Sequence, residues 1–166
     1  TLNDSEQLNC LQLLCNMNLS TIERVFSKIN LPNLSVLILF GNRIGRLDRD
    51  LFSSLKGLRK LVMFNSQIES IDFGAEANRL DNLEHLNLMR NDIRILRNGM
   101  FASLRNLRTL NLKSNKIETI EPDAFVGLDE LEELNLTSNA IISVDMSLVS
   151  SMSKLKKLAV GGSLVM

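Results

Sequence analysis

The sequence predicts an α/β repeat fold, a solenoid in which every repeat adds one strand to a parallel β-sheet and returns through irregular or short helical segments. Three observations lead to this prediction. One apolar pattern recurs six times between residues 34 and 166, its copies begin at a nearly constant spacing, and a second apolar set follows each copy.

The recurring pattern is leucine, two residues, leucine, one residue, an aliphatic residue, two residues, usually asparagine, one residue and an aliphatic residue. The spacing between copies is 24 residues, with one step of 25, because the copies start at Leu34, Leu58, Leu83, Leu107, Leu131 and Leu155. A fixed period of this length with this spelling is typical of a leucine-rich repeat.

The leucine-rich part of each copy is expected to form a short strand. Its alternating apolar residues point inward, and the residues between them point to the opposite, outer face of the sheet. The asparagine column then turns the chain out of the strand, and its amides can satisfy backbone groups of the buried turn. These asparagines are Asn42, Asn91, Asn115 and Asn139. Ser66 and Ser163 replace asparagine in two copies, where we expect a weaker ladder.

The second apolar set predicts the core of the convex side. Phe52, Phe101 and Phe125 occupy equivalent positions and are expected to stack as a buried phenylalanine series. The second copy departs from this pattern at residues 73–78, where the extra residue of the 25-residue step falls. We therefore expect a local bulge there, with one phenylalanine missing from the series.

The repeats divide the chain into two parts. Residues 1–33 are predicted to form an N-terminal capping unit, and residues 34–166 to form six repeats, of which the last is truncated. The chain starts at Thr1 without an initiator methionine or a signal peptide, so we expect a processed or excised piece. Its last repeat has no closing unit, which predicts exposed core residues that associate or are covered by another element.

The composition argues against several functions. Lysine plus arginine and aspartate plus glutamate both number 19, so bulk charge predicts neither nucleic-acid nor anionic-membrane binding. No apolar run approaches the roughly 18 residues of a membrane span. The single histidine, His85, has no nucleophile partner, and the two cysteines lack zinc-site spacing. We predict no enzymatic activity, no catalytic residues, no metal and no cofactor.

Residues 117–128, with phenylalanine at position 125, carry a resemblance to a known family. The chain resembles the "typical" leucine-rich repeats of secreted and cell-surface animal proteins, such as Toll-type receptor ectodomains, Slit-like guidance proteins and insect immune proteins. The resemblance implies a right-handed horseshoe with the sheet on its concave face, an extracellular location, and binding of another protein in immunity or receptor signalling. The alternatives are a self-associating structural scaffold and a cytosolic adaptor.

Cys10 and Cys15 lie close together before the first copy. They are interpreted as a disulfide in the cap, with two free thiols in a cytosolic protein as the alternative. The resemblance departs here from the usual four-cysteine flank and is similar to the short caps of insect immune members. Asn18 is the candidate glycosylation site, because a glycan on Asn135 would block the concave face.

The candidate binding surface consists of outer-face positions on the strands. Its N-terminal half is apolar and its C-terminal half is polar, and we select Phe40 and Phe64 as anchors. A partner protein, including a second copy of this chain, is one interpretation of the apolar patch; cover by the N-terminal segment or by a missing part of the chain is the other. The predicted surface comprises Val36, Ile38, Phe40, Val62, Phe64, His85, Asn87, Met89, Asn111 and Lys113.

Two further columns are interpreted as structural. Arg59, Glu84, Arg108, Glu132 and Lys156 alternate in sign, which predicts cross-strand ion pairs that serve solubility and register. The asparagine column at 87, 111 and 135 predicts a hydrogen-bonding ladder, with polar ligands such as glycans as the alternative.

Overall fold

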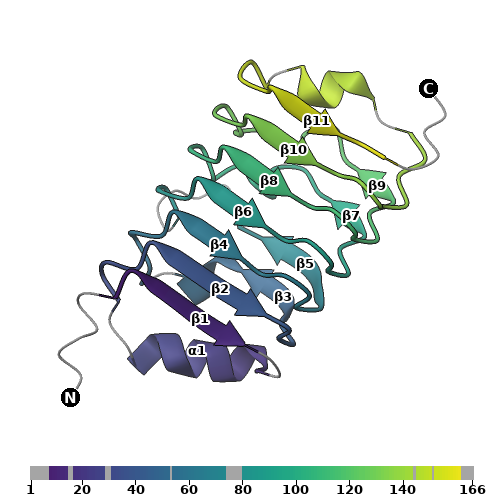
Figure 1. The fold of residues 1–166 in the computed structure, drawn as a ribbon. Helices are drawn as coiled ribbons and strands as arrows, with labels where there is room; N and C mark the ends of the chain where they lie inside the picture. The colour runs from purple at the N-terminus through teal and green to yellow at the C-terminus, as the bar shows by residue number, and fades with distance from the viewer. Residues whose placement is uncertain are drawn as a thin grey trace.

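The computed structural model describes residues 8–14, 17–28, 31–52, 54–73, 80–143, 145–150 and 152–161. A seven-stranded parallel sheet runs along the whole molecule in the order β1-β2-β4-β6-β8-β10-β11 (Figure 1). The strands are β1 (Cys10–Leu14), β2 (Val36–Phe40), β4 (Lys60–Val62), β6 (His85–Asn87), β8 (Thr109–Asn111), β10 (Glu133–Asn135) and β11 (Lys157–Ala159). Consecutive turns therefore stack side by side, which confirms the predicted solenoid.

The strands alternate between core and surface as predicted. In β2, Leu37 and Leu39 are fully buried, whereas Val36, Ile38 and Phe40 are partly exposed. The central leucine of each strand pairs in register with that of the next, so one leucine column lines the core. That column is Leu11, Leu37, Leu61, Leu86, Leu110, Leu134 and Leu158.

The opposite side of the solenoid is mostly irregular. It carries two small parallel sheets, β3 (Gly45–Asp48) with β5 (Ile68–Asp72) and β7 (Ile95–Leu96) with β9 (Thr119–Ile120). Short 3-10 helices occur at η2 (Arg49–Phe52) and η3 (Met146–Val149). Figure 1 shows the two small sheets behind the main sheet. The fold is thus two layers of backbone around one continuous core.

The phenylalanines of the convex side fill this core. Phe52 and Phe101 are fully buried and Phe125 is 3 % exposed; the Phe101 and Phe125 rings stack with centroids 6.3 Å apart. Phe73 is also buried, so the second repeat still places a phenylalanine in the core, although the sequence predicted that this repeat lacks one. The bulge expected at residues 73–78 falls almost entirely outside the described residues.

The asparagine column satisfies the buried turns as predicted. Asn91 Oδ1 accepts hydrogen bonds from the Ser66 and Ile68 amides, at 2.9 and 3.1 Å. Asn91 Nδ2 donates to the carbonyls of Met63 and Leu88, at 2.7 and 2.8 Å. One side chain therefore ties two neighbouring repeats together. Asn115 and Asn139 make equivalent bonds.

Ser66 makes only some of the hydrogen bonds that asparagine makes at this position. Its hydroxyl donates to the Leu39 carbonyl of the preceding repeat at 2.8 Å, and the Phe64 carbonyl of its own repeat lies further away, at 3.3 Å. A hydroxyl has a single proton to donate, whereas an amide nitrogen has two. Ser163, the second serine in this column, lies outside the described residues.

The N-terminal segment adds a turn to the same array. β1 pairs with β2 over five positions, and helix α1 (Leu19–Lys28) lies below β1 at this end of the sheet (Figure 1). Asn42 bonds to this segment as Asn91 bonds to its neighbour: Nδ2 donates to the Leu13 carbonyl at 3.0 Å, and Oδ1 accepts from the Met17 amide at 3.2 Å. The first copy is therefore covered by a strand and a helix.

The last strand is less well covered than the inner ones. Leu155, Leu158 and Val160 of the final repeat are only partly buried. The equivalent residues of the preceding repeat, Leu131, Leu134 and Leu136, are at most 1 % exposed. Among the described strands, β11 has a neighbour on one side only. These apolar side chains of the last described repeat are therefore partly exposed.

Replacing Asn91 with alanine is expected to destabilise the protein by about 3 kcal/mol or more, because buried backbone groups in two repeats lose their partners and each unsatisfied group costs about 1–3 kcal/mol. Urea denaturation measures the change. Asn87→Ala is the matched control, since its side chain makes one hydrogen bond, to the Met89 amide, and its loss should cost about 1 kcal/mol or less. Equal losses in the two variants would contradict the role given to the buried column.

Candidate functional site

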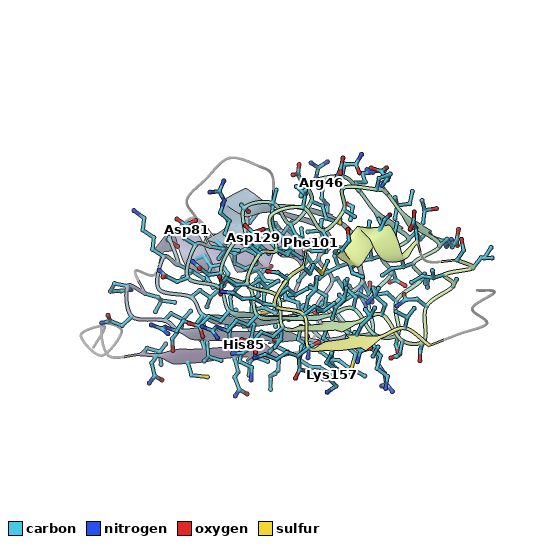
Figure 2. All side chains as sticks on the ribbon, turned by 90° about the horizontal axis from the view of Figure 1, so that it is seen from above. Arg46, Asp81, His85, Phe101, Asp129 and Lys157 are labelled. Atoms are coloured by element: carbon cyan, nitrogen blue, oxygen red, sulfur yellow. The ribbon has the colours of Figure 1, made fainter. Side chains whose placement is uncertain are left out.

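The strand residues that alternate with the buried leucines form one continuous surface, which we call the sheet face. It is the outer side of the seven-stranded sheet, the concave side in this fold class. Figure 2 shows His85 and Lys157 on this side, Arg46 on the opposite side, and Phe101 between them. The ten residues predicted for partner binding lie on the strands of the sheet face or in the segments that directly follow them.

The apolar end of the sheet face is ordered by aromatic stacking. The Phe40 and Phe64 rings lie nearly parallel, with centroids 5.2 Å apart and an interplanar angle of 8°. The guanidinium carbon of Arg90 lies 5.5 Å from the centroid of the Phe64 ring, within cation–π range. Because Arg90 follows β6 and Phe40 ends β2, they lie on opposite sides of the ring that follows β4. Both faces of the Phe64 ring are therefore occupied, which leaves the edge of this ring at the surface.

This stack continues the apolar patch onto β1. Leu14 pairs in register with Phe40 and is 57 % exposed. Partly exposed apolar residues surround the two rings on β2, β4 and the segment after β6, and Ile38 pairs in register with Val62. The structure thus brings together the predicted residues Val36, Ile38, Phe40, Val62, Phe64 and Met89. β1 lies beside this patch in the sheet and does not cover it.

Sequence reasoning missed Leu14 and Arg90. Leu14 belongs to a further copy of the repeat spelling, Leu8, Leu11, Leu13 and Asn16, which precedes Leu34 by 26 residues (34 − 8 = 26). The departure from 24 residues hid this copy. No sequence pattern points to Arg90, because its role depends on how its side chain folds back over a ring in the neighbouring repeat.

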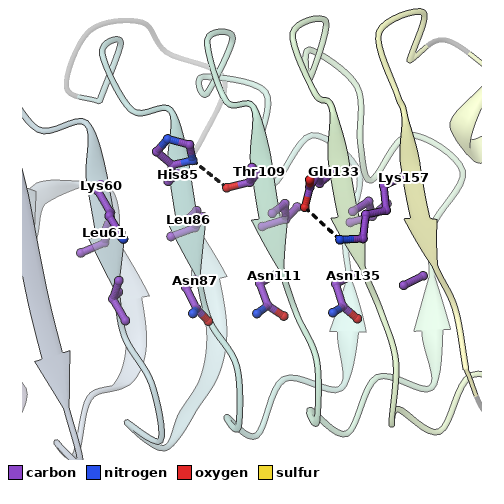
Figure 3. Close-up of a pocket in the computed structure, with 14 residues that line it drawn as sticks. Lys60, Leu61, His85, Leu86, Asn87, Thr109, Asn111, Glu133, Asn135 and Lys157 are labelled. Carbon is purple, nitrogen blue, oxygen red and sulfur yellow. Dashed lines mark hydrogen bonds and ion pairs between the residues drawn. The ribbon is translucent and has the colours of Figure 1, made fainter.

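The polar end of the sheet face is a shallow hollow of about 330 Å³ over β4 to β11 (Figure 3). Asn87, Asn111 and Asn135 lie across it in register. Each Oδ1 accepts a hydrogen bond from the backbone amide two residues further along its own repeat, just beyond the strand end, at 3.0 Å. The bonds therefore run within repeats, which differs from the ladder between strands that the sequence predicted.

Because the hydrogen bond to Oδ1 fixes the orientation of each asparagine side chain, it also fixes the direction in which Nδ2 points. In Figure 3 the nitrogen atoms of all three labelled asparagines turn the same way, toward the preceding strand. Within the described part of the chain, none of these Nδ2 groups donates a hydrogen bond. The hollow therefore presents three parallel amide donors, spaced by the strand separation of about 4.8 Å.

The row beside the asparagines is also polar. His85 Nδ1 lies 2.9 Å from the Thr109 hydroxyl, and Lys157 pairs with Glu133 at 3.6 Å (Figure 3). The predicted residue Lys113 lies one row further along, partly exposed. Among the described residues, no group of three or more histidine, cysteine, aspartate or glutamate side chains is placed to hold a metal ion.

The charged column pairs across strands as predicted. Arg59 contacts Glu84 at 2.8 Å, and Glu132 lies between Arg108 at 3.0 Å and Lys156 at 2.8 Å. The hydrogen bond and charge of Lys156, followed by those of Arg108, lower the pKa of Glu132 below its ordinary value. These pairs are largely exposed and consistent with a register role.

The predicted modifications lie near the N-terminal end. Cys10 is exposed on β1 with a free thiol, and Cys15 lies outside the described residues, so the disulfide stays a prediction. Asn18 is exposed, and its Oδ1 caps α1 by accepting the Thr21 amide at 2.9 Å. Glycosylation of Asn18 also stays a prediction. No helix in the described part of the chain has the length and apolar character needed to cross a bilayer.

The fold and the site define a solenoid repeat protein with an open sheet face. Comparison with known families agrees: the family described as "Leucine rich repeat" matches residues 32–93, 62–117 and 81–141. The chain belongs to the leucine-rich repeat family. No curated protein matches its sequence.

A solved structure of a Toll-like receptor is also similar. The crystal structure of a TLR13–ssRNA13 complex matches with a TM-score of 0.68 and 28 % identity. The match covers 94 % of this chain and 25 % of that chain. This chain therefore spans about a quarter of the length of the receptor chain it resembles.

Removing Lys156 is expected to raise the pKa of Glu132 toward its ordinary value of 4.5, because Lys156 is the largest cause of its lowering. A carboxyl with a lowered folded-state pKa stabilises the fold above pH 4.5, and the contribution is lost as pH falls through the lowered value. An NMR titration of the carboxyl carbon in Lys156→Met measures the shift.

Lys154→Met is the control for this titration, because Lys154 pairs with Glu130 and should leave the pKa of Glu132 unchanged. A Glu132 pKa that stays the same in Lys156→Met would contradict the pairing.

Proposed function

We propose that this chain is an extracellular recognition module that binds a partner protein through the sheet face, with Phe40 and Phe64 as anchors. The observation that carries the proposal is the stacked, partly exposed pair of rings on a surface bordered by other apolar side chains. Exposed apolar patches of this kind mark interaction sites. Rings held in place before binding lose little conformational entropy when a partner covers them.

Family membership supports binding rather than catalysis, since leucine-rich repeats and Toll-like receptors are typically binding modules. The likeness to a receptor chain supports an ectodomain setting and a role in innate immunity or receptor signalling. The chemistry of the sheet face agrees with recognition, because its one histidine faces a threonine hydroxyl and, among the described residues, no carboxylate or lysine hydrogen-bonds to it.

The related receptor is described in complex with single-stranded RNA. A protein partner suits this chain better. Single-stranded nucleic acids bind through bases stacked on aromatic faces and through many cations. Here Phe64 lies between Phe40 and Arg90, and the chain carries no net charge.

The test is a binding screen of the chain against secreted and cell-surface proteins, repeated with Phe40→Asp/Phe64→Asp. The double variant is expected to weaken binding at least about 100-fold, since full burial of each ring contributes about 1.5–3 kcal/mol and 1.4 kcal/mol is tenfold. Val126→Asp/Ile142→Asp is the matched control, because both residues are exposed and apolar and lie outside the main sheet. Unchanged binding in the phenylalanine variant, with circular dichroism showing that it is folded, would rule out these anchors.

A self-associating scaffold is the alternative function, since the same patch can pair with a second copy. Sedimentation analysis of wild type and Phe40→Asp/Phe64→Asp distinguishes the two. A dimer that dissociates only in the double variant would favour self-association through the sheet face. A dimer that persists in the variant would place its interface elsewhere.

A further inference from the structure

We propose that the partner presents an acidic, extended segment to the hollow over β6, β8 and β10, next to an apolar residue that packs on the phenylalanine stack. This inference rests on the proposed function and specifies the chemistry of the partner. It starts from an imbalance: the sheet face offers many hydrogen-bond donors and few free acceptors.

The asparagine row is the centre of this imbalance. The Oδ1 atoms of Asn87, Asn111 and Asn135 are already occupied by backbone amides at 3.0 Å. Thr137 adds a second donor to the Asn135 oxygen at 2.8 Å. What these side chains still offer are amide protons, which suit carbonyl and carboxylate oxygens.

The charged side chains of the sheet face also favour an acidic partner. Among the residues that the structure describes, the sheet face carries lysines at 60, 113 and 157 and a single carboxylate, Glu133, which already pairs with Lys157. Among the described residues, Lys60 and Lys113 form no ion pair. Arg90, over the Phe64 ring beside the hollow, is the third cation that forms no ion pair among the described residues. These cations make the sheet face locally basic, although the chain as a whole carries no net charge. A basic surface steers and orients a partner with complementary, acidic charge.

The dimensions fit an extended peptide. Side chains on one side of an extended strand recur about every 6.8 Å, and neighbouring sheet strands lie about 4.8 Å apart. The carboxylates of two alternate acidic side chains, which are on flexible arms, can therefore reach two of the three amide donors, and a backbone carbonyl of the segment can reach the third. The apolar residue of the same segment would lie toward β4 and β2, where the ring edges are exposed.

The test uses three synthetic probes: a peptide with a leucine–phenylalanine end followed by glutamate at alternate positions, the same peptide with glutamine for glutamate, and a single-stranded oligouridylate of equal charge. The readout is the set of side-chain amide signals of the three asparagines in nitrogen-15 NMR. The glutamate peptide is expected to shift these signals and to bind at least about tenfold more tightly than the glutamine peptide, with affinity falling as salt rises.

Charge-reversed variants locate the effect. Lys60→Glu/Lys113→Glu is expected to abolish the shifts. Lys56→Glu/Arg97→Glu, with the same change in net charge at exposed positions away from the sheet face, should leave them intact. Equal affinity for the two peptides, shifts confined to other residues, or no binding would overturn the inference. Tighter binding of the oligouridylate at the same amides would overturn it in favour of a nucleic acid.

These outcomes are separable from the proposed function. Suppose that Phe40→Asp/Phe64→Asp loses binding to a partner protein, whereas Lys60→Glu/Lys113→Glu binds the partner as tightly as wild type does. The phenylalanine anchors are then supported, and the proposal of an acidic segment is contradicted. If the phenylalanine variant keeps its partner, the proposed function fails whatever the peptides do.

Discussion

The structure depends on parallel, in-register stacking of short strands whose buried turns have no water to bond to. The leucine column provides the apolar contact between repeats, and the asparagine column adds side-chain hydrogen bonds to the backbone bonds of the parallel sheet. Asn91 alone joins four backbone groups across two repeats, which is why one residue type recurs at this position. Because every repeat obeys the same register, a side chain at one strand position always meets its equivalent on the next strand.

That register creates the candidate site. Residues 24 or 25 apart in the chain become neighbours, so phenylalanines at 40 and 64 stack and three asparagines align. The sheet face therefore changes from apolar at β2 and β4 to donor-rich at β6, β8 and β10, and one partner segment can meet both. The sheet face consists of strand positions whose side chains do not pack in the core, so core packing does not determine which residue types occupy them.

Much of this could be predicted from the sequence, because burial follows the repeat spelling. The strands, the asparagine column, Phe52, Phe101 and Phe125 all lie where the period places them. Three features could not be predicted. The copy that contains β1 starts 26 residues before the next copy, instead of 24. The register shift next to Gly45 in β3 has no equivalent in the repeat pattern. Each sheet-face asparagine turns onto its own repeat, because the strands are three residues long and its Oδ1 accepts a hydrogen bond from the backbone amide just beyond the strand end.

The alternation of core and sheet face can be measured directly with two methionines of the unmodified protein. Met63 is fully buried behind the sheet, and Met89 is partly exposed on the sheet face. Under limited peroxide oxidation, mass spectrometry of the digested protein should find Met89 converted to the sulfoxide well before Met63. Equal rates, or faster oxidation of Met63, would contradict the register on which both the fold and the binding surface rest.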